Sequence, residues 1–517
     1  MNRDEQLPRG TDPEEGGPVV VDTPDAEAGT LDQATPDGGS ADGTASRRAG
    51  RNVVAVVTAE LLGKAATVAF TVVVARELGA TAFGSFSYAL AFGLLLATFV
   101  AWGFDAEVLR RGSADRRVLN DVLGQAVLLR TFHAVPIVVL GSVIGILTRP
   151  DAAAAQALIL VLLATLLDSY GDAGRASATA CEQPGRASFA LVVQRVSACV
   201  LAIGVLAAGG GLVAVCAAYL ASSAAGLVIL SLILKRLGVR PQLHGADRPA
   251  LVGMWRSTFV LGLEQVLGMA LFRIDAIILG ELSSDRHVAA YAVGYRLMET
   301  VLFVTWSVSR SLFPAMVRAG SGRALLAVAE NAMAVAAAVL MPYGFLMLIE
   351  GGRILRLLFG EEYGAESTVS LQWLAFAPVA FALQFFIAYV LLVQNRKKWI
   401  LLTTAFAVVV NLALNTALIP EFGAPGAAFS TTVSYLAAGL MSVVLVSRSA
   451  GLFRVDRALL LCLLASLPMA AVLVLLHVNV VVESAVGGVV YLVSYLLIAS
   501  WWAPEQVALV RSLVRRG

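Results

Sequence analysis

The chain has 517 residues, of which 58% are hydrophobic and 14% are charged, and its formal net charge is +2. Soluble domains carry about 25% charged residues. This composition therefore excludes an ordinary soluble protein and predicts that lipid covers much of the surface.

Residues 1–46 form an acidic segment rich in Pro and Gly, with few large apolar side chains. Such a segment buries too little apolar surface to offset its ordering entropy, so we predict a disordered tail. It has neither the basic start nor the apolar stretch of a cleaved secretory signal. We therefore expect the first membrane helix to direct insertion.

From Asn52 to Trp502, apolar stretches of about twenty residues follow one another almost without a break, and each is long enough to cross a bilayer. The predicted spans begin near residues 52, 86, 122, 152, 187, 212, 256, 288, 325, 368, 400, 426, 459 and 482. The predicted fold is an all-α polytopic membrane protein of about 14 transmembrane helices. We expect a six-helix bundle at 47–240, a second at 241–450, and two further helices with a basic tail at 451–517.

Basic residues return on every second loop. The loops predicted to share one side of the membrane carry Arg47, Arg110, Arg175, Lys235, Arg318, Arg396, Lys397, Arg454 and Arg515. The opposite loops are acidic at Glu281, Asp285, Glu361 and Glu362. By the positive-inside rule, both termini lie in the cytoplasm and the protein spans the cell membrane. Topology and anionic membrane lipids explain the arginines, so nucleic acid is not an expected partner.

A faint internal repeat links the two halves. A shift of 204 residues places Glu60 on Glu264 and Glu77 on Glu281, and a second match pairs residues 210–227 with 423–440. Repeat-built transporters bind their substrates between the repeats. The sequence therefore predicts two pseudo-symmetric bundles around a central cavity.

Ionisable residues within spans are candidates for function, because a charge at bilayer depth costs about 2.5 to 3.5 kcal/mol on insertion scales. The candidates for substrate binding are Arg296, Arg273, Arg130, Arg195, Arg310 and Lys64. The candidates for ion coupling are Glu60, Glu264, Asp275 and Glu299. Helical spacing places Glu60 with Lys64 on one face, and Glu264 with Asp275 on another, and we expect these faces to meet across the cavity. Arg273 then points elsewhere, toward Glu299.

Each candidate also has a structural interpretation. Glu60 and Lys64 can neutralise each other as an (i, i+4) pair. A second alternative is a purely structural ion-pair network of Arg273, Asp275, Arg296 and Glu299. Asn411 and Asn415 can join helices by hydrogen bonds without meeting a ligand.

Other chemistries lack their motifs. The four cysteines are isolated, with no CxxC and no paired histidines, so we expect no metal site. No P-loop motif occurs, no cofactor is expected, and no soluble catalytic domain is recognisable. Transport is the favoured class, and the chain is not expected to be an enzyme.

Several segments resemble one known family in order and spacing. They are 75–79 (ARELG), 272–280 (FRIDAIILG), 288–297 (VAAYAVGYRL), 311–314 (SLFP), 357–363 (LLFGEEY) and 423–428 (GAPGAA). Together they resemble the polysaccharide-biosynthesis or Wzx-type lipid-linked oligosaccharide flippases, whose superfamily also contains the MATE-type multidrug exporters. The resemblance covers essentially the whole membrane region.

The resemblance implies two six-helix bundles packed in a V, two additional C-terminal helices, and alternating access. It also implies that a polyprenyl-pyrophosphate-linked oligosaccharide or related glycolipid moves to the outer leaflet, in exchange for H⁺ or Na⁺. Arginines in the cavity would suit the pyrophosphate. Polysaccharide-assembly proteins are possible partners.

Two alternatives remain open. A multidrug exporter of the same architecture would expel cationic drugs, although the excess of arginines favours an anionic ligand. A membrane glycosyltransferase or polysaccharide polymerase would act on the same lipid carrier, but such enzymes usually need a large extramembrane loop.

Overall fold

The computed structural model describes residues 41–502, apart from 150, 244–245, 455 and 477. The acidic tail up to residue 40 and the basic residues Arg511, Arg515 and Arg516 lie outside the described residues. The described part contains sixteen α-helices and one short 3-10 helix, and no strand is present within it. The expected all-α fold class is confirmed.

The helices alternate with short connections along the chain. The first half contains α1 (Ala41–Ala101), α2 (Phe104–Ala114), η1 (Arg116–Val118), α3 (Leu119–Thr148), α4 (Ala152–Ala180), α5 (Pro184–Ala207) and α6 (Leu212–Arg236). The second half contains α7 (Arg248–Leu282), α8 (Asp285–Val301), α9 (Phe303–Ala319), α10 (Gly322–Phe359), α11 (Ala365–Leu374), α12 (Ala377–Val393), α13 (Lys397–Phe422), α14 (Ala424–Ala450), α15 (Asp456–Leu475) and α16 (Val480–Trp502).

Within the described residues, 12 helices are long and apolar enough to cross a membrane. One of them, Leu61–Ala101, is broken at Gly79, where φ is 74° and ψ is 169°. The helix α7 is not among the twelve, but it packs against α13 and α14. Counting the broken helix as two crossings and adding α7 brings twelve to fourteen, in agreement with the sequence. The protein is therefore a multi-pass membrane protein.

Local sequence explains where several helices start. The Asp151 side chain accepts a hydrogen bond from the Ala154 amide at 3.1 Å, and Asp247 accepts one from Ala250 at 3.0 Å. Both are N-caps, which satisfy amide groups that have no partner inside the helix. The Asp247 cap fixes the beginning of α7, the helix that carries three of the six ionisable candidates of the second half.

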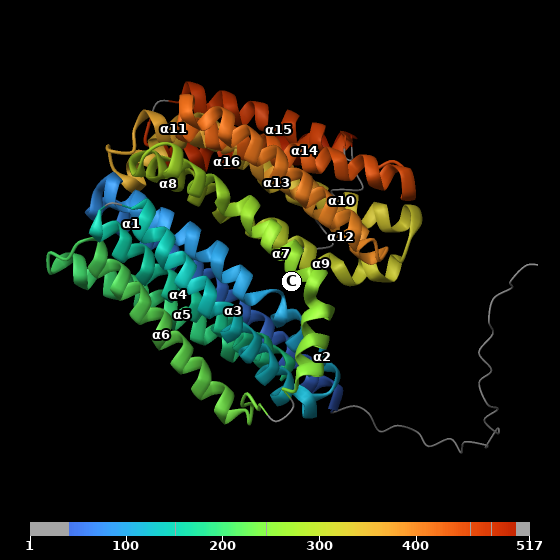
Figure 1. The fold of residues 1–517 in the computed structure, drawn as a ribbon. Helices are drawn as coiled ribbons and strands as arrows, with labels where there is room; N and C mark the ends of the chain where they lie inside the picture. Colours follow the sequence, from blue (N-terminus) through green and yellow to red (C-terminus); the bar gives the residue numbers. More distant parts are fainter. Residues whose placement is uncertain (1–40, 150, 244–245, 455, 477, 503–517) are drawn as a thin grey trace, which may run out of the picture. The chain divides into compact units, whose positions relative to one another are not determined.

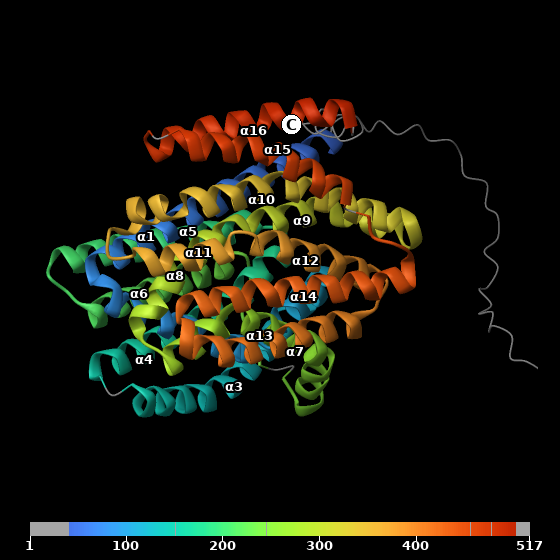
Figure 2. The same ribbon diagram turned by 90° about the horizontal axis from the view of Figure 1, so that it is seen from above.

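Neighbouring helices of each half pack on one another within residues 51–517, which form one compact unit. In the first half, α2, α3, α5 and α6 each contact α4, whereas α7 to α14 pack together in the second half (Figure 1). The helices α15 and α16 pack on α10 and lie at one edge in Figure 2. The domain boundaries at residues 240 and 450 stay a prediction.

The internal repeat has a structural counterpart. The break in α1 at Gly79 and the end of α7 at Ser283 are themselves 204 residues apart. In the second match, α6 begins two residues after Gly210 and α14 begins one residue after Gly423. Matching segments therefore start and stop helices at matching places.

A polar cluster joins the two halves at the break of α1. We call it the Arg149 cluster, and it consists of Ser85, Tyr88, Arg149, Glu281 and Asp285. Arg149 donates to Asp285 at 2.6 Å and lies 3.5 Å from the Tyr88 ring centroid. Ser85 donates to Asp285 and Tyr88 to Glu281, both at 2.5 Å. This cluster links α1 and α3 to the junction of α7 and α8.

The loop between α10 and α11 adds to the same junction. Arg76 donates to the Leu358 carbonyl at 2.6 Å, and the Tyr363 hydroxyl donates to the Ala75 carbonyl at 3.0 Å. The amide of Ala80 donates to Glu362 at 3.1 Å. The bonds to the Ala75 carbonyl and from the Ala80 amide satisfy backbone groups beside the break in α1, and the bond from Arg76 satisfies a carbonyl at the end of α10.

A second contact between the halves lies where α1 ends and α2 begins. Trp102 stacks on Trp255 of α7, with ring centroids 6.3 Å apart and an interplanar angle of 2°. A Cβ atom on Gly262 would lie 2.7 Å from the Trp102 carbonyl oxygen, so the two backbones approach closely there. The halves thus touch at both of these places, and the candidate site lies between helices of both.

Candidate functional site

A cavity of about 360 Å³ lies between α1, α5, α8 and α9. Its charged lining consists of Lys64, Arg195, Arg296, Glu299 and Arg310. Four of the six residues predicted to bind substrate therefore meet at one cavity, from helices of both halves. We call it the cationic cavity, since among the described residues its lining has four cationic side chains and one carboxylate.

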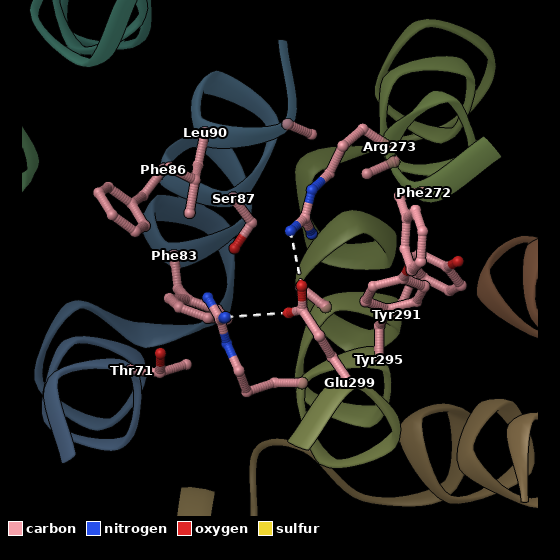
Figure 3. Close-up of a pocket in the computed structure, with 14 residues that line it drawn as sticks. Thr71, Phe83, Phe86, Ser87, Leu90, Phe272, Arg273, Tyr291, Tyr295 and Glu299 are labelled. Carbon is pink, nitrogen blue, oxygen red and sulfur yellow. Dashed lines mark hydrogen bonds and ion pairs between the residues drawn. The ribbon is translucent and has the colours of Figure 1, made fainter. Parts of the chain in front are cut away.

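Glu299 pairs with two arginines at once. Its carboxylate accepts from Arg273 at 2.7 Å and from Arg296 at 3.0 Å, as the dashed lines in Figure 3 show. The expected approach of Arg273 to Glu299 is confirmed. A smaller pocket of about 40 Å³ adjoins these residues and is also lined by Thr71 and Phe83 of α1.

Arg195 stands out among the cations of the cavity. No carboxylate lies within ion-pair distance of it in the described part of the chain, whereas Arg296 is paired with Glu299. A Cβ atom on Gly63 would lie 3.0 Å from Arg195 Nη1, so a residue without a side chain leaves room for the guanidinium beside α1. Arg195 is half-buried, which makes it a strong candidate to hold an anion.

Two aromatic rings lie beside Lys64, and one of them, that of Trp306, lines the cationic cavity. The Lys64 ammonium lies 5.4 Å from the Phe303 ring centroid and 5.5 Å from that of Trp306. Both distances are within the range of cation–π interactions, which hold the Lys64 side chain against the start of α9. Neither aromatic residue is among the candidates predicted from the sequence, because charge at membrane depth singles out ionisable residues and not rings.

Arg130 requires a correction. It was expected in the cavity, but its side chain is 0% exposed and pairs with Asp105 of α2. It also donates to the Ser169 carbonyl of α4. Arg130 therefore ties together helices of the first half, which is the structural role of a buried ion pair.

Asp275 also lies away from the cationic cavity. It is 0% exposed, and its carboxylate accepts hydrogen bonds from Tyr291 at 2.9 Å and Thr431 at 2.7 Å. Asn411 donates to it at 2.8 Å, and Asn415 donates as well. The predicted bonding of the two asparagines between helices is confirmed, with Asp275 as their partner. A four-residue network with Arg273, Arg296 and Glu299 is not formed, because Asp275 faces α13 and α14.

The two remaining carboxylates lie elsewhere. Glu264 lines a different cavity, between α2, α7, α9, α12 and α13. The side chain of Glu60 lies outside the described residues, so its expected pairing with Lys64 stays a prediction. In the described part of the chain, no group of three His, Cys, Asp or Glu residues is placed to hold a metal ion.

Membrane-crossing helices from two related halves, with charged side chains facing a cavity between them, define a membrane transporter or flippase. A sequence profile described as "Polysaccharide biosynthesis protein" matches residues 49–319, which is just over half of the chain. The chain belongs to this polysaccharide biosynthesis protein family. A profile described as MatE matches residues 261–417. The resemblance drawn from the sequence is confirmed.

A curated relative is the probable low-salt glycan biosynthesis flippase Agl15 of Haloferax volcanii, which is 25% identical over 249 residues. The match covers 47% of this chain and 52% of the relative, so the chain spans about half the length of that protein.

Among solved structures, the lipid II flippase MurJ in an inward closed conformation matches with a TM-score of 0.71 and 13% identity, over 88% of this chain and 100% of that one. An inward-facing MATE family multidrug resistance transporter matches with a TM-score of 0.61 and 15% identity, over 76% of this chain and 96% of that one. The fold is therefore that of the superfamily of MATE transporters and lipid flippases. The proteins it resembles are flippases and transporters rather than enzymes.

Proposed function

We propose that this protein is a flippase that moves a polyprenyl-(pyro)phosphate-linked oligosaccharide, or a related glycolipid, across the cytoplasmic membrane by alternating access. The observation that carries the proposal is the cationic cavity, with Arg195, Arg296, Arg310 and Lys64 on its walls. A sugar diphosphate cannot cross hydrocarbon unaided, because no partner there replaces its hydration. Guanidinium groups can supply charge-assisted hydrogen bonds to phosphate.

The family membership and the flippase relative support the same function. Cell-surface polysaccharides are assembled from units that form on the cytoplasmic leaflet, and such units need a carrier. The positive-inside pattern of the loops supports cytoplasmic termini. Polysaccharide-assembly proteins remain expected partners under this proposal.

Ion coupling belongs to the same proposal, and Asp275 is its best candidate. The buried carboxylate accepts hydrogen bonds from the hydroxyls of Tyr291 and Thr431 and from the amide nitrogens of Asn411 and Asn415, on three other helices. Asn415 Oδ1 is buried and has no hydrogen-bond partner among the described residues. A buried carboxylate among polar groups of several helices, with an unsatisfied amide oxygen beside it, suits H⁺ or Na⁺. Glu299 suits this role less, because two arginines already neutralise it.

The first test measures translocation of a labelled polyprenyl-diphosphate oligosaccharide in proteoliposomes. We expect Arg195→Gln to lower the rate about 10-fold or more, since a hydrogen bond to a charged group contributes about 1.5 to 3 kcal/mol. The matched control is Arg186→Gln, which changes an exposed arginine on the same helix and should leave the rate unchanged. Imposed Na⁺ and H⁺ gradients, applied separately, identify the coupling ion.

A MATE-type multidrug exporter is the second candidate, because the MatE profile matches residues 261–417. The same vesicles distinguish the two functions. If the wild-type protein moves no glycolipid but expels a cationic dye down an ion gradient, the flippase proposal is wrong.

A further inference from the structure

The cavity that contains Glu264 has a chemistry unlike that of the cationic cavity. We call it the Glu264 cavity, and it has a volume of about 620 Å³. It lies between α2, α7, α9, α12 and α13, and Glu264 and Gln384 are among its polar lining residues. Its size falls within the range of small-molecule sites, which is about 300 to 1,000 Å³.

The deep polar groups of this cavity include hydrogen-bond acceptors that lack donors. No cationic side chain lies within ion-pair distance of Glu264 in the described part of the chain. Gln384 is 9% exposed, and its Oε1 atom has no hydrogen-bond partner among the described residues. The hydroxyls of Ser257 and Thr258 are already used, since both donate to the Met254 carbonyl, at 2.9 and 3.0 Å. A ligand that donates hydrogen bonds would satisfy these acceptors.

The other charges of the cavity lie toward α2 and the start of α13. Arg110 pairs with Glu107 at 2.7 Å, and 69% of the Arg110 side chain is exposed. Lys397 is exposed where α13 begins. Of the two carboxylates among the described lining residues, Glu107 therefore has an ion-pair partner and Glu264 has none.

Aromatic rings form a continuous wall beside the acceptors. Phe381, Phe385 and Tyr389 follow at four-residue spacing along α12, with neighbouring ring centroids 5.3 and 5.1 Å apart. Phe272 of α7 extends the wall, at 5.6 Å from Phe381. Sugar rings have apolar C–H faces that pack on aromatic rings and hydroxyls that donate to carboxylates and amides. A wall of rings beside unpaired acceptors therefore fits a carbohydrate.

The two cavities share a boundary. Trp306 lines both the cationic cavity and the Glu264 cavity. Phe272 lines the Glu264 cavity and also the small pocket beside Arg273 and Arg296. A phosphate held by the arginines would thus lie next to a sugar held by the aromatic wall. This is the covalent order of a sugar diphosphate.

We propose that the Glu264 cavity is the glycan subsite of the transported lipid, and that Glu264 selects neutral or amino sugars over acidic ones. The inference rests on the proposed flippase function and deepens it by naming a class of glycan. An unpaired carboxylate accepts hydrogen bonds from hydroxyl or ammonium groups, but it repels a uronic acid. Selectivity therefore comes from both an attractive and a repulsive element.

The test compares two polyprenyl diphosphates with the same lipid chain, one carrying a neutral disaccharide and the other a disaccharide with a uronic acid. We expect wild-type protein in proteoliposomes to move the neutral lipid at least about 10-fold faster. Glu264→Gln keeps an acceptor but removes the charge, so the ratio should fall at least about 3-fold while the neutral lipid still moves. Glu361→Gln is the matched control, because Glu361 is 89% exposed and does not line the cavity, and its ratio should equal that of the wild type.

Further arms separate the failure of this inference from the failure of the flippase proposal. Tyr389→Leu should slow both sugar lipids but leave binding of the sugar-free polyprenyl diphosphate unchanged, whereas Arg195→Gln should weaken that binding. If wild type moves both sugar lipids equally and Glu264→Gln leaves the ratio unchanged, the glycan subsite is overturned and the flippase stands. If no lipid moves, the flippase proposal itself fails. A loss of quaternary-ammonium binding in Glu264→Gln, with an unchanged sugar ratio, would instead make the cavity a cation site.

Discussion

At the scale of single residues, Glu299 neutralises more of the cationic cavity than any other described side chain of its lining. It accepts from Arg273 and Arg296, and the three side chains are 18 to 22% exposed. Partial burial strengthens such pairs, but it also means that a lone arginine would be poorly solvated. The carboxylate thus sets how many positive charges remain for a ligand.

Replacing Glu299 tests this balance. Glu299→Gln leaves Arg273 and Arg296 without a counter-charge, so we expect the free energy of unfolding to fall by about 3 kcal/mol. Thermal unfolding in detergent measures the change. The control is Glu361→Gln, since Glu361 is 89% exposed and 4.0 Å from Arg356, and its pair should contribute less than about 1 kcal/mol. An equal effect of the two substitutions would contradict the buried role of Glu299.

At the scale of elements, the break in α1 positions the site. Gly79 has φ of 74° and ψ of 169°, a region of backbone space that side chains essentially exclude. The break turns the chain between two membrane crossings and exposes backbone groups that Glu362 and Tyr363 then satisfy. Lys64 and Thr67 of the cationic cavity precede the break, whereas Ser85 and Tyr88 of the Arg149 cluster follow it.

Alanine substitution tests the backbone argument. Gly79→Ala should cost about 1 to 3 kcal/mol of stability, because a Cβ atom strains this conformation. The control is Gly204→Ala in α5, where a Cβ atom would meet nothing within 4 Å and the backbone is helical. That substitution should be neutral or slightly stabilising. Chemical unfolding measures the free energy of unfolding of both variants. An equal loss in the two would show that a side chain at position 79 causes no particular backbone strain.

At the scale of the whole membrane unit, two of the contacts between the halves are candidates for gates. One is the Arg149 cluster and the other is the stack of Trp102 on Trp255. Alternating access requires that each contact break while the other holds. The first contact depends on a close approach, since a Cβ atom on Gly84 would lie 1.7 Å from the Asp285 carbonyl oxygen.

Forcing this approach apart should shift the conformational equilibrium. The Cβ atom of Gly84→Ala cannot fit against the Asp285 carbonyl oxygen. We therefore expect α1 near its break to separate from the start of α8. In a Ser87→Cys background, alkylation by a membrane-impermeant thiol reagent should then become at least about 10-fold faster, measured by peptide mass. Gly488→Ala is the control, because a Cβ atom there meets nothing within 4 Å. Unchanged labelling with a folded protein would exclude the Arg149 cluster as a gate.

Much of the architecture was predictable because each crossing helix must form all its backbone hydrogen bonds within itself in lipid. A continuous apolar stretch of sequence is therefore enough to identify it. The span count, the repeat spacing and the approach of Arg273 to Glu299 all followed from local patterns. The environments of Arg130 and Asp275 did not. Both are ionisable residues within helices, and helical periodicity alone does not say whether a face meets a cavity or another helix.

The sequence by itself therefore determined the membrane-crossing helices, their number, and the set of charged residues at membrane depth. Only the tertiary structure decided which of those charges share a cavity. Lys64, Arg195, Arg296 and Arg310 come from four helices in both halves, and Glu264 faces a separate aromatic cavity. The physical reason is that hydropathy and glycine conformation act over a few neighbouring residues, whereas the partner of a buried charge is chosen by packing between helices far apart in the chain.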